Sequence, residues 1–106
     1  MNNFSDMLAK AKAMQEKMKE AQDEIKNIEV EGTSGGDLVK VTLSGDYELK
    51  SIEITEAARK ESQDIINDLI KAAYNNAKEN LKKKSAEKLS QVTGGLNLPF
   101  DFKLPI

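Results

Sequence analysis

Apolar residues near the start of the chain recur in alternating steps of four and three positions. The pattern comprises Met7, Ala11, Met14, Met18, Ala21, Ile25 and Ile28. Such a heptad spacing is typical of a long helix that packs against another helix along one seam. Residues 1–28 contain no Gly or Pro and are rich in Ala, Lys, Glu, Gln and Met, which favour helix. The pattern therefore predicts one long helical arm over residues 1–28.

After Ile28 the apolar residues alternate with polar ones, which indicates half-buried β-strands. Gly35 and Gly36 supply a first turn, because glycine accepts a positive φ without steric cost. Gly45 lies at a position suited to a second tight turn. We expect a three-stranded antiparallel sheet over residues 29–54.

In the third of these strands the apolar residues switch from odd to even positions along its length. Leu49 and Ile52 would face opposite sides of a regular strand, so a β-bulge near Lys50 and Ser51 is needed to bring them to one face. We assign the core or a dimer interface to the following apolar positions: Val39, Val41, Leu43, Ile52, Ile54, Met14 and Met18.

A second helical pattern follows over residues 62–93, with Ser62 as a candidate N-cap. Its apolar face thins beyond Leu81, where three lysines come in succession. We expect this end of the helix to leave the body of the protein as an arm. Residues 94–106 form a tail with two prolines that is too apolar for a solvated extension, so it either packs on the body or docks elsewhere.

These elements predict an α+β fold in one domain of 106 residues. A domain of this size buries well under three quarters of the surface that its unfolded chain exposes. Several of the apolar residues also lie along the heptad seam of the first helix. We therefore expect a second copy of the chain to complete the core.

Composition excludes several classes of function. The chain has no His, the usual general base and commonest metal ligand, and no Cys for thiolate chemistry or disulfides. It also has no phosphate-binding loop motif. We expect no enzymatic activity, no cofactor and no metal. No apolar run approaches the ~20 residues that span a bilayer, so we expect a soluble, cytoplasmic protein with no membrane partner.

Charge is distributed unevenly along the chain. The net charge of −2 is unlike that of a typical nucleic-acid-binding domain, which is basic. However, residues 27–58 carry a net −5, whereas residues 59–106 carry +3, and residues 71–88 alone carry +4. An acidic middle and a basic late helix give a polarised molecule, in which a basic arm is available for an anionic partner.

Charge alone does not identify the anionic partner, but if it is DNA, sequence-independent binding needs basic side chains that meet phosphates. We assign these contacts to two groups of lysines: Lys82, Lys83, Lys84 and Lys88 on the late helix, and Lys10, Lys12, Lys17 and Lys19 on the first helix. Arg59 is the only arginine, and lysine lacks the two-pronged geometry with which arginine recognises guanine. We therefore expect contacts with the DNA backbone rather than with bases.

Four segments in the same order resemble the YbaB/EbfC family of bacterial nucleoid-associated proteins. They are AMQEKM at 13–18, GGDLVKV at 35–41, DLIKAAYNNA at 68–77, and GGLNLP at 94–99 followed by FKLP at 102–105. The resemblance covers essentially the whole chain. It implies a tweezer-like homodimer with a shared central sheet and projecting helical arms. It also implies binding to DNA in the nucleoid, and it brings no cofactor or reaction.

The sequence thus predicts a nucleoid-associated protein that binds duplex DNA and alters DNA conformation, nucleoid organisation or gene expression. The alternative is a helical adaptor that binds other proteins through its methionine-rich seam and its apolar tail, without a direct role at DNA.

Overall fold

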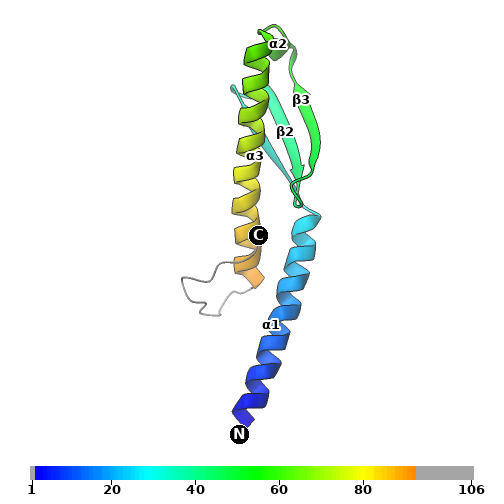
Figure 1. The fold of residues 1–106 in the computed structure, drawn as a ribbon, viewed down its shortest axis with the longest axis vertical. Helices are drawn as coiled ribbons and strands as arrows, with labels where there is room; N and C mark the ends of the chain where they lie inside the picture. The colour runs from blue at the N-terminus through cyan, green and yellow to red at the C-terminus, as the bar shows by residue number, and fades with distance from the viewer. Residues whose placement is uncertain (1, 93–106) are drawn as a thin grey trace.

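The chain forms an elongated molecule with extents of 72 × 24 × 17 Å, as the computed structural model shows for residues 2–92 (Figure 1). Its elements, in chain order, are α1 (Asn2–Lys26), β1 (Glu29–Ser34), β2 (Val39–Ser44), β3 (Leu49–Ile54), α2 (Glu56–Arg59) and α3 (Gln63–Val92). This order confirms the predicted α+β fold class. The predicted tail at 94–106 lies outside the described residues.

Helix α1 ends at Lys26, two residues before the predicted boundary. The N–H of Ile28 still donates to the carbonyl of Ile25 over 3.1 Å, but the carbonyl of Ile28 accepts from the N–H of Gly45 over 2.9 Å. The last position of the heptad pattern therefore belongs to the junction between helix and sheet. No helix within residues 2–92 is long and apolar enough to cross a membrane.

The three strands form one antiparallel sheet in the order β1-β2-β3. Along β2, Thr42 pairs with Ser51 and Leu43 pairs with Leu49, which leaves Lys50 as an extra residue in β3. This is the β-bulge that the change of parity predicted. Because of it, Leu49 and Ile52 face the same side of the sheet as Val41 and Leu43.

The two turns of the sheet use glycine differently. In the first, Gly35, Gly36 and Asp37 have φ values of 60°, 65° and 72°, so the glycines provide the left-handed backbone that was expected. In the second, the left-handed residue is Tyr47, with φ 65°. Gly45 is needed there for another reason, since a Cβ at this position would collide with the carbonyl of Ile25 at the end of α1.

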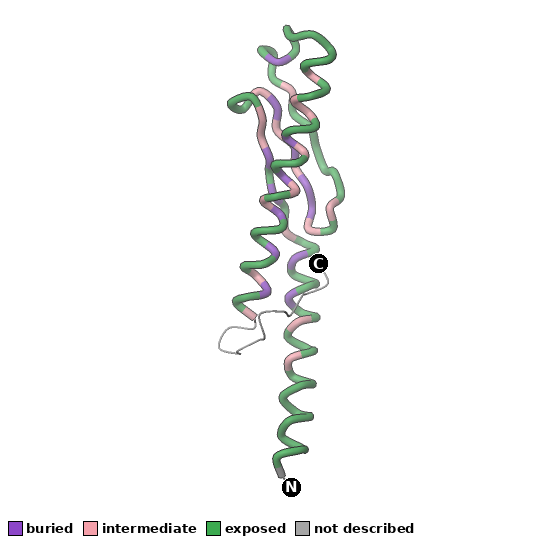
Figure 2. The backbone as a smooth tube through the Cα atoms, turned by 60° about the vertical axis from the view of Figure 1, so that its left-hand side comes forward, coloured by how far each residue is buried: buried purple, intermediate pink, exposed green. Residues whose placement is uncertain are grey.

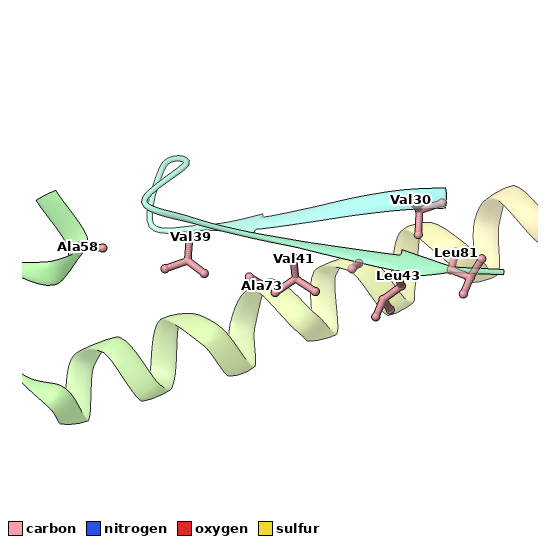
Figure 3. Packing of buried hydrophobic residues seen from close by; sticks show 8 residues of the cluster. Val30, Val39, Val41, Leu43, Ala58, Ala73 and Leu81 are labelled. Atoms are coloured by element: carbon pink, nitrogen blue, oxygen red, sulfur yellow. The ribbon is translucent and has the colours of Figure 1, made fainter. Parts of the chain in front are cut away.

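Helix α3 packs along one face of the sheet against β1 and β2 (Figure 3). Val39, Val41 and Leu43 have no exposed surface, and they pack with Ala73 and Leu81 of α3. The helix comes so close to β1 that a Cβ on Gly32 would fall on the backbone nitrogen of Ala77 and the carbonyl oxygen of Ala73. Small residues on both sides of this contact permit the close approach.

This close approach also seals the free edge of β1. The N–H of Thr33 donates to Asn76 Oδ1 over 2.9 Å, and Asn80 Nδ2 donates to the carbonyl of Glu31 over 2.8 Å. An edge strand normally presents such backbone groups to any strand that approaches. Here two amides, one helical turn apart on α3, occupy them, so strand addition at β1 is blocked.

The late part of α3 extends beyond the sheet, but it packs against α1 instead of projecting alone (Figure 1). Leu89 is 1% exposed and lies in a second apolar cluster with Ala21 and Ile25 of α1 (Figure 2). Ser85 is also 1% exposed, so the buried stripe continues past Leu81. Sequence inspection missed this because Ser85 counts as polar, whereas a small hydroxyl fits a close helix contact.

The Gly32 contact yields a test of the helix–sheet spacing. Gly32→Ala should lower the free energy of unfolding by about 1–3 kcal/mol or more, because a backbone cannot move aside as a flexible side chain does. Urea denaturation followed by circular dichroism measures this. Gly36→Asn is the control, since no atom lies within 4 Å of a Cβ there and Asn tolerates a positive φ. Equal stability of Gly32→Ala and the unmodified chain would show that α3 lies farther from β1.

Candidate nucleic-acid interface

The antiparallel ends of α1 and α3 build a helical arm below the sheet (Figure 1). Val92 at the end of α3 lies beside Lys17 and Ala21 of α1, with which it lines a shared hollow. The N-terminal half of α1 continues beyond the end of α3 (Figure 1). All eight lysines assigned to DNA are on this pair of helices.

Lys82, Lys83 and Lys84 are all exposed, but they do not share one face of α3. Successive residues of an α-helix point about 100° apart, so three lysines in a row fan out over roughly 200°. A flat stretch of DNA backbone therefore meets one or two of them at a time.

The three lysines also differ in the charge of the residues that lie one turn away on α3. Lys82 lies one turn from Lys78, and Lys84 lies one turn from Lys88, so each is in a pair of like charges. Lys83 instead lies one turn from Glu79 and one turn from Glu87, an acid on either side. Each of the three successive lysines has Glu79 or Glu87 three or four residues away, but only Lys82 and Lys84, on the two flanks of the helix, also have a lysine one turn away.

The two flanks differ in what faces them. Lys88 is held by Glu24 of α1 at 3.4 Å, which ties it to the contact between the helices and partly neutralises it. Within the described part of the chain, no ion pair involves Lys78 or Lys82. Their flank points away from Asn76 and Asn80, which cover the β1 edge, and hence toward the β3 side of the sheet. Lys71 continues the same flank.

The lysines of α1 form two rows rather than one face. Lys10 and Lys17 are seven residues apart, and so are Lys12 and Lys19, with the rows about 160° apart around the helix. Lys26 extends the second row. Each of the four assigned lysines has an acid three or four residues away, namely Asp6, Glu16, Glu20 or Asp23. The net field along α1 is correspondingly weak.

The outer face of the sheet has the opposite character. Glu31 and Glu53 point to solvent there, and between them Lys40 makes ion pairs at 3.4 Å and 4.0 Å. These pairs are exposed and contribute little stability. The result is an acidic surface that is unsuited to phosphate and that leaves the helical arm as the candidate interface.

The structure gives mixed results for the residues assigned to the core or a dimer interface. Val39, Val41 and Leu43 are buried within one chain. Ile54, Met14 and Met18 are half-buried, and Ile52 is 41% exposed. α3 covers β1 and β2 but leaves the inner face of β3 open.

The model of the YbaB/EbfC DNA-binding family matches residues 1–96 of this sequence. The chain belongs to this family. The match confirms the resemblance drawn from four segments of the sequence, and with it the DNA-binding family to which the resemblance pointed.

Proteins similar to this family member are named nucleoid-associated proteins. One from Bartonella bacilliformis is 44% identical over 99% of this chain and 98% of its own length. One from Bartonella tribocorum is 43% identical over 99% of both chains, and one from Hahella chejuensis is 39% identical over 97% and 95%.

A crystal structure of an uncharacterized protein from Helicobacter pylori shares the fold. It superposes with a TM-score of 0.68 over 86% of this chain and 97% of that one, at 18% sequence identity. The arrangement of helices and sheet is therefore one that has been seen experimentally.

The packing of α3 on α1 determines how the lysine flanks are displayed, and Leu89 tests it. Leu89→Ala should lower the free energy of unfolding by about 2 kcal/mol or more, because it empties the second apolar cluster. Thermal denaturation measures the loss. Glu87→Ala, two residues away and exposed, should stay within about 0.5 kcal/mol. Indistinguishable melting of the two variants would mean that α1 and α3 do not pack in this region.

Proposed function

We propose that this protein binds duplex DNA in the bacterial nucleoid as a homodimer, mainly through contacts between lysines and phosphates. Membership of a DNA-binding family and the names of the relatives support the DNA and nucleoid parts of this proposal. The observation that carries the mode of binding is the pairing of lysines one turn apart on α3, a helix without arginine, in which Lys82 and Lys84 are exposed and Lys78 and Lys88 are half-buried.

The position of the single arginine favours backbone contacts over base recognition. Arg59 is on α2, at the end of the molecule remote from the arm (Figure 1), and its Nε donates to the carbonyl of Ile54 over 3.3 Å. Lysine binds phosphate as a point charge but does not make the two-pronged contact that identifies guanine. Affinity should therefore depend on salt more than on sequence.

The proposed DNA-contacting residues are those assigned from the sequence, with an order that the structure suggests. Lys82 and Lys84 come first because each has a lysine one turn away, whereas Lys83 has only acids at that spacing and Lys88 pairs with Glu24. Lys78 joins the set through its pairing with Lys82. The lysines of α1 are the second group: Lys10, Lys12, Lys17 and Lys19.

The homodimer is proposed to form across β3. Asn76 and Asn80 occupy two backbone groups of the β1 edge, whereas the outer edge of β3 pairs with no described strand. Beside that edge, Leu49 is 47% exposed and Ile52 is 41% exposed, both on the side of the sheet that α3 covers elsewhere. A second copy placed there would continue the sheet, bury this surface and bring the two Lys78–Lys82 flanks to face one another.

The lysine assignment is tested by changing Lys82, Lys83 and Lys84 together to Gln. Binding to unrelated DNA duplexes should weaken alike, and the slope of log affinity against log salt should fall by about 0.9 for each lost phosphate contact. A gel-shift series with salt titration measures both.

The matched control changes Lys40, Lys50 and Lys60 to Gln, which removes the same charge from the sheet and the segment after α2. It should leave the slope nearly unchanged. Equal effects of the two triple variants would reject the arm as the interface. An unmodified protein without affinity for DNA near physiological salt would reject DNA binding and favour the adaptor function instead.

The dimer surface is tested by Ile52→Asp. A charge on this half-open surface should dissociate the dimer without unfolding the chain, because in one copy the carboxylate remains in contact with water. Analytical ultracentrifugation with circular dichroism separates the two effects. Ser51→Asp, on the opposite face of β3, is the control and should remain dimeric. A folded dimer with Asp at 52 would place the interface elsewhere.

A further inference from the structure

Helix α1 has an apolar surface that is covered in one half and bare in the other (Figure 2). Toward its C-terminal end, Ala21 and Ile25 are buried against Leu89. Toward its N-terminal end, Phe4, Met7 and Leu8 are 68%, 66% and 57% exposed. The change occurs where α3 ends, with Met14 and Met18 half-buried at the boundary. We call the surface of Phe4, Met7, Ala11, Met14 and Met18 the bare seam.

The chain itself supplies a segment at the beginning of this seam. Helix α3 runs antiparallel to α1, and its last residue, Val92, lies beside Lys17 and Ala21 (Figure 1). Residues that continue in the direction of α3 therefore start next to Met18 and head toward Phe4. Fourteen residues follow Val92 in the sequence, and they lie outside the described residues.

The sequence of this segment is suited to an extended chain with one apolar side. Between 96 and 106 every even position is apolar, whereas odd positions hold Asn, Pro, Asp, Lys and Pro. This alternation matches the period of an extended strand, and the prolines oppose a helix. Eleven extended residues span about 36 Å, whereas the seam from Met18 to Phe4 rises about 21 Å. The segment is thus long enough to follow the whole seam.

We propose that residues 96–106 lie along the bare seam of α1 in the same chain and complete the apolar packing of the arm. A shallow hollow of about 260 Å³ lies along one side of this surface, lined by Met14 of the seam and by Lys10, Ala13 and Lys17 on its flank. Its two lysines border the seam, where Asp101 of the segment can approach them. Lys12 and Lys19 lie on the other side of α1 and remain exposed to solvent.

The distribution of methionine and cysteine makes this proposal directly measurable. All four methionines lie within the first 18 residues, and the chain has no cysteine. Methyl-¹³C-methionine labelling therefore gives NMR signals from the seam. A single introduced cysteine carries a nitroxide spin label at one chosen place. We expect a label on Asn97→Cys to broaden Met14 and Met18, and a label on Lys103→Cys to broaden Met7. A label on Glu56→Cys, on α2, should broaden none of them.

Two further samples distinguish the proposed arrangement from its competitors. Phe100→Asp in the Lys103→Cys chain should release the segment and restore the Met7 signal, whereas Asn97→Asp, at an odd position, should not. Methionine-labelled chains without a nitroxide, refolded with unlabelled chains that carry it, report contact between copies. Broadening in this mixed sample would show that the segment covers the seam of a second copy and would overturn the proposal. Sharp Met7, Met14 and Met18 signals in every sample would show that the segment does not dock there.

Discussion

The contact between Gly32 of β1 and the Ala73–Ala77 turn of α3 determines much of the architecture. Because neither the strand nor the helix has a large side chain at this contact, the helix axis lies close to β1 instead of over the centre of the sheet. Asn76 and Asn80 can then reach past the strand and bind its outer backbone groups. The same displacement leaves Leu49 and Ile52 without a cover. One small contact thus closes one edge of the sheet and leaves the other available.

The buried stripe of α3 explains how one straight helix serves both the sheet and the arm. Its buried residues recur every four positions: Ala73, Ala77, Leu81, Ser85 and Leu89. A step of four residues overshoots one helical turn by about 40°, so the stripe winds by roughly 160° along this stretch. It faces the sheet at its start and α1 at its end. The direction of the arm is therefore set by continuous packing rather than by a flexible joint, which fixes where the lysines are presented.

Local rules in the sequence were enough to predict the strands, the bulge at Lys50 and the helix cap at Ser62, whose Oγ accepts from the N–H of Ile65 over 3.3 Å. Those rules could not predict contacts between segments that are far apart in the sequence. Nothing in the sequence around Asn76 marks it as a partner of β1, and Lys88 gives no sign of its pairing with Glu24. The four-residue spacing through Ser85 was visible, but only the facing helix shows why a serine belongs there.

The positions of the charged side chains in the candidate interface were likewise not evident from the order of residues in the sequence. Three successive lysines suggest one basic patch, yet helical geometry separates them and places Lys83 between two acids. Conversely, Lys78 and Lys82 are not consecutive in the sequence, yet their side chains are neighbours on the helix because they are four residues apart. A prediction from spacing at i and i+4 would have found this pair, because that rule needs no tertiary information.

The net charge of −2 is a poor guide to the partner of an elongated molecule. At physiological salt, exposed charges are screened beyond about 8 Å, whereas this rod extends over 72 Å. A phosphate beside the end of α3 therefore senses the charges nearest to it rather than the net charge of the whole chain. Local segregation of charge, with acids on the outer face of the sheet and lysines on the late part of α3, thus makes the proposed binding of DNA through the arm compatible with an acidic overall composition.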